Sequence, residues 1–292
     1  MYVIMGATGQ VGGATAKALL EQGEQVRVVV RSKEKAEIWR ENGAEPVFAD
    51  YRDAEALQAA FTDAEGVFVM NPAVFYPSEG FPETRETVAA VAQALIGARV
   101  PKFVALSSVG AHRPNGLGII ESLHILEQEL SSLPMPSAFL RAAWFQDNSI
   151  WDVESARDKG QVVGFLQPLD RKIPMIATVD IGQIAAKTLR QSWEGVRYLE
   201  LQGPEPYSPN DIAEIWGGLL NREVQAIALP RDEWAEVFVH QGGPADRVHG
   251  RMAMLDGFNT GWIDFECEGT EHITANMTLE DTLEQWIKQR NA

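Results

Sequence analysis

Short strand-like runs alternate with amphipathic stretches along the first half of the chain, a pattern typical of sheets whose strands are linked by helices. The strand-like runs cover residues 2–5, 26–30, 46–49, 67–70, 102–106 and 137–141. Helical periodicity predicts helices that end near residue 23 and others at about 33–41, 54–61, 83–96 and 119–130. This rhythm predicts a parallel sheet wound on both faces, with ligands at the carboxyl ends of its strands.

The alternation loosens after about residue 150. A strand at 173–177, a helix at 178–190 and a strand at 198–201 continue the first pattern, whereas helix-like stretches follow near 232–240, 244–258 and 279–288. We therefore predict an α/β protein with two unequal parts. Residues 1–150, with 173–202 returning to them, form the larger domain, and residues 151–172 and 203–292 form a smaller α/β lobe that binds substrate.

The first strand-like run leads directly into a glycine-rich turn, Gly6-Ala7-Thr8-Gly9-Gln10-Val11-Gly12. Its three glycines suit a tight turn, a close approach of the backbone to a pyrophosphate, and close packing of helix on strand. The unpaired N–H groups from Thr8 to Val11 would then bind phosphate oxygens. An ordinary strand-to-helix turn has similar glycines, but the flanking strand and helix favour dinucleotide binding.

The second strand ends at Arg31, 19 residues after Gly12. At about this spacing an acidic residue would bind the ribose 2′-hydroxyl of NAD, whereas an arginine would bind the 2′-phosphate of NADP. Arg31, Ser32 and Lys35 therefore predict a preference for NADP(H) over NAD(H), although a solvated basic helix start is the alternative. Asp50 follows the third strand, where an adenine amino group would be bound.

The fourth and fifth strands also end in candidate site residues. Asn71 opens an aromatic, proline-bearing loop that contains Tyr76, and this loop forms either a pocket wall or a patch packed on the other lobe. Ser107 lies at the end of the fifth strand, either as a cap or as a catalytic hydroxyl.

Two further segments carry candidate chemistry. On the helix at 119–130, His124 and Glu127 are three residues apart and could form a titratable pair near neutral pH, or only a structural contact. After the sixth strand, Trp144, Phe145 and Asn148 lie where the nicotinamide end of a dinucleotide is expected.

Composition excludes several classes of function. The 292 residues carry a net charge of −16, which argues against a nucleic-acid partner. The single cysteine, Cys267, cannot form an internal disulfide, and the histidines show no ligand-like spacing, so we expect no metal site. No apolar run reaches membrane-spanning length and no secretory signal precedes the first strand, so a cytoplasmic protein without a membrane partner is expected.

These motifs together resemble the NmrA-like branch of the atypical short-chain dehydrogenases and reductases. The resemblance rests on the glycine-rich turn, on Arg31, and on later segments distributed over essentially the whole chain. Those segments are 49–51, 107–110, Leu123-His124 with Glu127-Gln128, 140–141, 175–177, 180–182 and 261–263. The resemblance implies a Rossmann domain, a small C-terminal lobe over the nicotinamide, and NADP(H) as cofactor.

One feature departs from the wider superfamily. Short-chain dehydrogenases carry a Tyr-x-x-x-Lys pair in the helix after the fifth strand, whereas this chain has Ile119 and Leu123 there, and none of its tyrosines has a lysine four residues on. Ordinary reversible carbonyl chemistry is therefore in doubt, whereas hydride transfer to a quinone or azo compound needs less acid assistance.

Two functions follow from the resemblance. The first is an NADPH-dependent oxidoreductase that transfers hydride to a small quinone, azo or enone acceptor in a cleft between the lobes, with Asn71 and Ser107 at the ribose and Phe145 and Tyr76 along the ring. His124 and Ser107 are its candidate catalytic residues, and Tyr76, Trp144 and Asn148 its candidate substrate contacts. The alternative is a non-catalytic protein that senses NADP(H), acting through a protein partner or as a homodimer.

Overall fold

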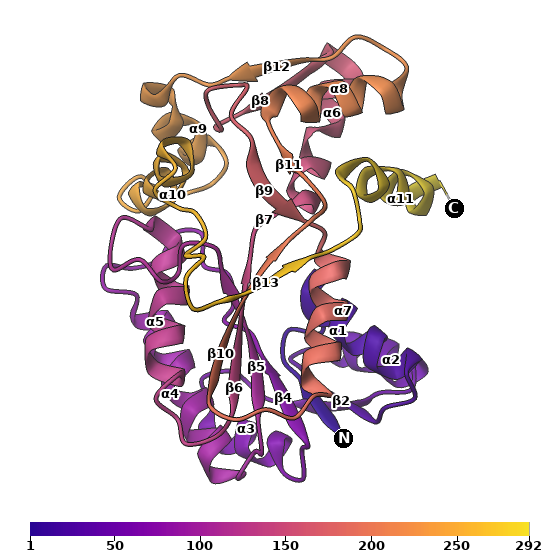
Figure 1. Ribbon diagram of the computed structural model, residues 1–292, viewed down its shortest axis with the longest axis vertical. Coiled ribbons are helices and arrows are strands. Elements are labelled where there is room, and N and C mark those ends of the chain that lie inside the picture. The colour runs from indigo at the N-terminus through magenta and orange to yellow at the C-terminus, as the bar shows by residue number, and fades with distance from the viewer. Residues whose placement is uncertain (292) are drawn as a thin grey trace.

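A parallel eight-stranded sheet forms the centre of the larger part of the molecule (Figure 1). The structure is a computed structural model that describes residues 1–291. The sheet has the strand order β13-β10-β6-β5-β4-β1-β2-β3. Its strands are β1 (Tyr2–Ile4), β2 (Val26–Val30), β3 (Glu45–Phe48), β4 (Gly66–Val69), β5 (Phe103–Ser108), β6 (Ser137–Ala142), β10 (Val196–Gln202) and β13 (Glu271–Thr274). The predicted α/β architecture with a doubly wound parallel sheet is confirmed.

Helices cover both faces of this sheet. The helices α1 (Gln10–Glu21), α2 (Lys33–Glu41) and α7 (Thr178–Leu189) bury apolar residues in one core. The helices α3 (Ala54–Phe61), α4 (Pro82–Gly97) and α5 (Glu121–Leu130) share the core on the opposite face. Successive residues of a strand point to alternate faces, so Ile4 joins the first core and Val3 the second. This arrangement explains why the strands are apolar throughout.

The smaller lobe lies above the carboxyl ends of the central strands in Figure 1. It contains a three-stranded sheet of β11 (Pro206–Tyr207), β9 (Ile173–Ile176) and β7 (Trp144–Phe145), and a pair formed by β12 (Gln225–Ala228) and β8 (Gln161–Gly164). Its α-helices are α6 (Val153–Lys159), α8 (Pro209–Leu220), α9 (Trp234–His240), α10 (His249–Thr260) and α11 (Leu279–Asn291). Short 3₁₀ turns are η1 (Gly118–Ile120), η2 (Gln146–Asp152) and η3 (Arg231–Glu233). Two fully buried tryptophans, Trp216 and Trp234, anchor its two apolar clusters.

Two strands pair differently from the sequence-based division. Residues 173–202 were expected to return together to the larger domain, but β9 pairs with β7 and β11 in the small sheet, and only α7 and β10 join the large sheet. Conversely, β13 belongs to the 203–292 segment but pairs with β10 at the edge of the large sheet. Both strands are only four residues long, and a strand this short does not specify its pairing partner from sequence. The domain boundaries themselves remain a prediction.

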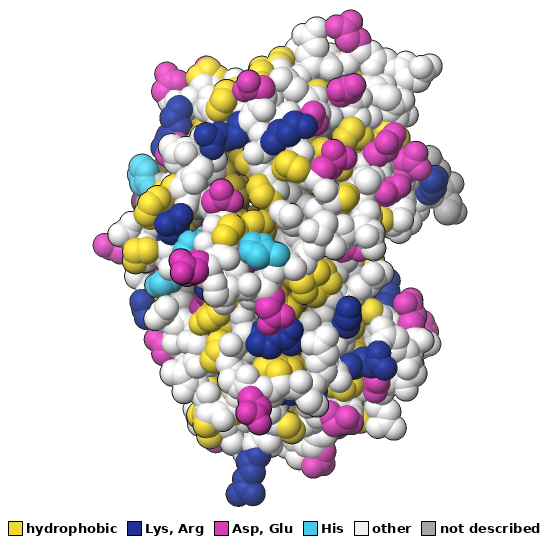
Figure 2. Space-filling view, viewed as in Figure 1, with side chains coloured by type: hydrophobic (Ala, Val, Ile, Leu, Met, Phe, Trp, Pro, Cys, Tyr) yellow, Lys and Arg dark blue, Asp and Glu magenta, His cyan; other side chains and the backbone are white. Residues whose placement is uncertain are grey.

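The surface carries charges of both signs. In Figure 2 the basic side chains on the visible face are scattered among acidic ones. Among residues 1–291, the helices are all too short or too polar to cross a bilayer.

Candidate functional site

The glycine-rich turn links β1 to α1 by close backbone contacts. Gly6 has a φ of +68°, and its carbonyl accepts a hydrogen bond of 2.9 Å from the N–H of Gly9. A Cβ on Gly12 would lie 2.4 Å from the Gly6 oxygen, so only glycine lets the helix approach the strand this closely. Helix start and strand end are therefore held together at the carboxyl edge of the sheet.

The N-terminus of α1 is open to an anion. Its N-cap, Gly9, has no side chain to cap the helix, and no acidic residue lies in the first turn. By contrast, Ser32 caps α2 and Asp53 caps α3 with side-chain oxygens. Thr8, Gly9 and Gln10 are exposed, whereas the side chain of Val11 is buried in the core beneath α1. These features fit a pyrophosphate bound by main-chain N–H groups.

The Tyr51 side chain is hydrogen-bonded to this turn, a role that the sequence did not predict. The N–H of Gly6 donates a hydrogen bond of 2.6 Å to the Tyr51 hydroxyl. Burial of that hydroxyl raises its pKa, which keeps it protonated. The Arg31 guanidinium lies 6.0 Å from the centre of the Tyr51 ring. Tyr51 therefore links the phosphate turn to the residue predicted to choose the cofactor.

Arg31 and Lys35 are exposed at the carboxyl end of β2 and the start of α2. Within residues 1–291 neither has an acidic partner within ion-pair distance. Both charges are therefore available to a phosphate. The main chain of Lys35 also closes the Ser32 cap, which fixes where α2 begins.

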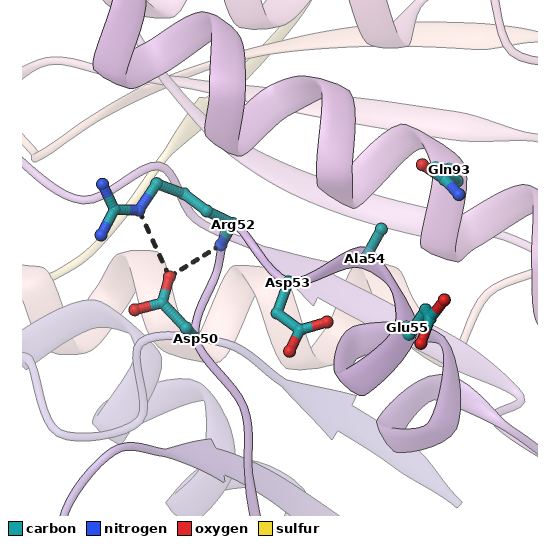
Figure 3. Close-up of a pocket in the computed structure, with 6 residues that line it drawn as sticks. All are labelled: Asp50, Arg52, Asp53, Ala54, Glu55 and Gln93. Atoms are coloured by element: carbon teal, nitrogen blue, oxygen red, sulfur yellow. Dashed lines mark hydrogen bonds and ion pairs between the residues drawn. The ribbon is translucent and has the colours of Figure 1, made fainter.

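Asp50 lies beside an open hollow of about 570 Å³ (Figure 3). The Arg52 main-chain N–H donates a 2.9 Å hydrogen bond to Asp50 Oδ1, and this bond is the main reason that the pKa of Asp50 is lowered. The hollow is also lined by Asp53, Ala54, Glu55 and Gln93, and by no residue of the glycine-rich turn. Asp50 is the only predicted site residue in it, so this hollow is not the predicted phosphate site.

Ser107 belongs to a buried charged network. Its hydroxyl donates a 2.5 Å hydrogen bond to Glu127 Oε1, and the same carboxylate forms bonds of 3.0 and 2.8 Å with the Arg141 guanidinium. All three side chains are almost fully buried. Because the Ser107 hydroxyl already donates its hydrogen bond to a carboxylate, it can accept a hydrogen bond from a ligand but not donate one.

His124 does not pair with Glu127. Glu127 is buried in the network with Arg141, whereas His124 Nδ1 lies 2.7 Å from the main-chain oxygen of Ala111. The expected pair at i, i+3 is therefore wrong in geometry, because Glu127 turns toward β6. A carbonyl only accepts, so Nδ1 carries a hydrogen, and Nε2 is protonated only in the imidazolium form.

The remaining predicted residues lie after β4, on β7 and on η2. Asn71 Nδ2 lies 3.5 Å from Thr84 Oγ1, and Phe145 packs against the core that contains α1 and α7. The Trp144 ring meets Phe258 edge-on at 5.0 Å. Asn148 is exposed on η2. The site between the lobes and the roles of these residues remain predictions.

Tyr76 packs on the smaller lobe. A Cβ on Gly243 would lie 2.5 Å from the Tyr76 ring, and the Tyr76 hydroxyl lies 3.3 Å from Arg251 Nη1. Of the two interpretations of this aromatic loop, contact with the other lobe is the one seen for Tyr76. Phe75 remains 56% exposed beside it, so the loop also presents an aromatic surface.

Comparison with known proteins identifies the family. A model of the NmrA-like family matches residues 2–254. An NAD(P)H azoreductase from Xenophilus azovorans is 24% identical over 245 residues, which are 84% of this chain and 82% of that protein.

Solved structures share the fold. An NADPH-dependent quinone oxidoreductase from Escherichia coli, complexed with NADPH, superimposes with a TM-score of 0.80 at 21% identity, covering 98% of this chain and 100% of that one. A Citrobacter sp. triphenylmethane reductase complexed with NADP(H) gives a TM-score of 0.77 at 20% identity, covering 97% and 99%. With a glycine-rich turn at its first strand, a Rossmann-type sheet and a family match over most of its length, the chain belongs to the NmrA-like family.

Proposed function

We propose that this protein is an NADPH-dependent oxidoreductase that transfers hydride to a small electron-poor acceptor of the quinone, azo or enone type, in a cleft between the lobes. The observation that carries the proposal is the uncapped start of α1, whose glycine-rich turn is connected through Tyr51 to Arg31. Within residues 1–291, Arg31 forms no ion pair. The reaction class is supported by relatives named as an azoreductase, a quinone oxidoreductase and a triphenylmethane reductase.

The cofactor end of the site binds phosphate and adenine. Main-chain N–H groups from Thr8 to Val11 bind the pyrophosphate, and Arg31 with Lys35 binds the 2′-phosphate. Because NADH lacks the 2′-phosphate, the protein prefers NADPH to NADH. Asp50 accepts a hydrogen bond from the adenine amino group.

The reactive end orients the nicotinamide ring and the acceptor. Bound NADPH supplies the hydride, and the protein contributes mainly proximity and orientation. Asn71 and Ser107 hold the ribose, Phe145 lines the ring, and Trp144 and Asn148 contact the acceptor. The imidazolium form of His124 supplies the proton from Nε2, because Nδ1 is held by the Ala111 carbonyl.

A non-catalytic NADP(H) sensor is the second candidate. Two observations favour it. The chain lacks the Tyr-x-x-x-Lys pair, and the Ser107 hydroxyl donates its hydrogen bond to Glu127, so it is not available to protonate a substrate. In a sensor the two lobes would adopt different arrangements with the oxidised and the reduced nucleotide, and a protein partner or a second copy would detect the difference.

The assay that separates these candidates is NADPH oxidation, followed by the near-ultraviolet absorbance of the reduced nicotinamide, against a panel of quinones, azo dyes and enones. The oxidoreductase proposal expects turnover with at least one class. Saturable NADPH binding by calorimetry without turnover of any acceptor would favour the sensor. If neither NADPH nor NADH binds, both candidates are wrong.

A further inference from the structure

The edge of the large sheet brings together three side chains whose ligand atoms suit a transition metal. These residues are Glu200 on β10, Cys267 in the loop before β13 and His272 on β13. Each offers one ligand atom, and the three ligand atoms lie within 4.8 Å of one another. Glu200 and His272 are far apart in the sequence but face each other in the register of β10 and β13. Sequence spacing therefore gave no sign of this cluster.

Glu200 is held in a fixed orientation. Its side chain is fully buried and accepts hydrogen bonds of 2.7 Å from the N–H of Glu266, 3.2 Å from the N–H of Cys267 and 3.0 Å from the Thr270 hydroxyl. These donors fix the loop against the carboxylate and bring the cysteine next to it. Outer hydrogen bonds of this kind orient ligands in metal sites.

His272 lies at a suitable distance from that carboxylate. Its Nε2 atom is 3.2 Å from Glu200 Oε2, and the Phe265 ring packs edge-on against the imidazole. Two ligand atoms about 2.0 Å from a tetrahedral zinc ion lie about 3.3 Å apart. A metal ion can therefore replace the hydrogen bond between these two groups without moving their strands.

Local charge also favours a cation. Around the Arg141 guanidinium lie three carboxylates: Glu127 at 2.8 Å, Glu266 at 2.5 Å and Glu200 at 4.0 Å. Arg141, Glu127 and Glu200 are buried whereas Glu266 is exposed, so the buried side chains carry one negative charge more than positive. Buried charge of one sign requires compensation, and a dication would supply it.

We propose that Glu200, Cys267 and His272 bind a divalent transition metal of the zinc type, with the fourth position open to water. A thiolate, an imidazole and a carboxylate are a donor set that selects zinc-type ions over magnesium or calcium. Binding displaces the Cys267 thiol proton to solvent and leaves His272 neutral. The ion would fix β13 and the loop before it to β10, and it takes no part in hydride transfer.

The test uses the full chain without an affinity tag, stripped by a chelator and titrated with Zn²⁺ by calorimetry. We expect the wild-type chain to bind one equivalent of Zn²⁺ saturably. Cys267→Ser and His272→Gln should each weaken Zn²⁺ binding on the order of 100-fold or more. His240→Gln is the matched control, because His240 is also exposed but bonds only to a carbonyl of its own helix. Both ligand positions are exposed, so these substitutions leave the fold intact.

Cobalt gives an independent measurement. Co²⁺ bound to the wild-type chain should show thiolate-to-cobalt charge-transfer absorption, which Cys267→Ser removes and His240→Gln retains. Absence of saturable Zn²⁺ heat, or equal Zn²⁺ affinity in all three variants, would overturn the proposal. NADPH binding by the metal-free chain is unaffected in either case, so the result is separate from the function proposed above.

Discussion

At the scale of single residues, Arg31 is the position that should decide nucleotide choice. Arg31→Glu is expected to weaken NADPH binding by about 10- to 100-fold, because a charge-assisted hydrogen bond to the 2′-phosphate is replaced by repulsion between two negative charges. NADH, which lacks that phosphate, should bind about as before. Calorimetric titration of both nucleotides measures the difference.

The control for this substitution is Arg99→Glu, which makes the same charge change at an exposed position before β5, at the opposite end of the strands. Equal weakening of NADPH in both variants would mean that only the overall charge matters. In that case the specific contact at Arg31 would be wrong.

His124 is the second position where the structure sharpens an expectation. If its imidazolium supplies the proton, His124→Ala should lower kcat on the order of 100-fold with little change in NADPH affinity. His249→Ala, at an exposed histidine of α10, is the control. An unchanged rate with the preferred acceptor removes His124 from the mechanism and leaves solvent as the proton source.

Sequence patterns indicated some of these residues and not others. Gly12 could be predicted, because its role depends on local spacing along the chain. Tyr51 and Arg141 could not, because their roles depend on partners brought close only by the fold: Gly6 in one case and Glu127 in the other. A charged residue inside a strand that is otherwise buried, as Arg141 and Glu200 are, is nevertheless a signal worth following.

At the scale of elements, the contact between α1 and α7 holds the phosphate-binding helix in place. A Cβ on Gly182 of α7 would lie 2.4 Å from the Ala14 Cβ and 2.7 Å from the Thr15 nitrogen of α1. The backbone of α1 cannot yield locally. We therefore expect Gly182→Ala to destabilise the protein by about 1–3 kcal/mol and to weaken NADPH, because the start of α1 shifts.

Gly218→Ala is the matched control for this contact. Gly218 also lies inside a helix, α8, but an added Cβ meets nothing within 4 Å. That variant should be unchanged or more stable by up to about 1 kcal/mol, because alanine favours helix. Urea unfolding of both variants gives the comparison, and a Gly182→Ala protein as stable as wild type would contradict the packing argument.

The first six strands and the helices between them were predictable from sequence. Each strand is a mostly apolar run, and each helix shows apolar residues at helical spacing. The pairing of β9 and β13 was not. β13 is only four residues long and three of them are exposed, so no alternation of polar and apolar residues marks it. Its place is determined by β10, which supplies the hydrogen-bonding edge.

At the scale of the whole molecule, one partly buried carboxyl should determine how stability changes with pH. Burial raises the pKa of Asp152, at the junction of η2 and α6, to about 7. Because this pKa is above the unfolded value of about 3.9, the neutral form stabilises the fold at acid pH. That contribution is lost as the pH rises toward and through 7.

Asp152→Asn should therefore be more stable than wild type above about pH 7, by roughly 1–2 kcal/mol, and equal to it near pH 4. This figure is smaller than the full pKa shift implies, because the side chain is partly exposed. Thermal or urea unfolding across that pH range measures it. Asp158→Asn, at an exposed residue of α6 whose carboxyl has a lowered pKa, should show no such gain at alkaline pH.

The position of β13 also has a consequence for synthesis on the ribosome. The larger sheet cannot close its β10 edge until residues 271–274 have left the exit tunnel, after every strand of the smaller lobe has been made. Nascent chains therefore carry an uncovered β10 edge from the synthesis of residues 196–202 until that of residues 271–274, and such edges bind chaperones or other nascent chains. Completion of the larger sheet is thus tied to synthesis of a strand that follows every strand of the smaller lobe.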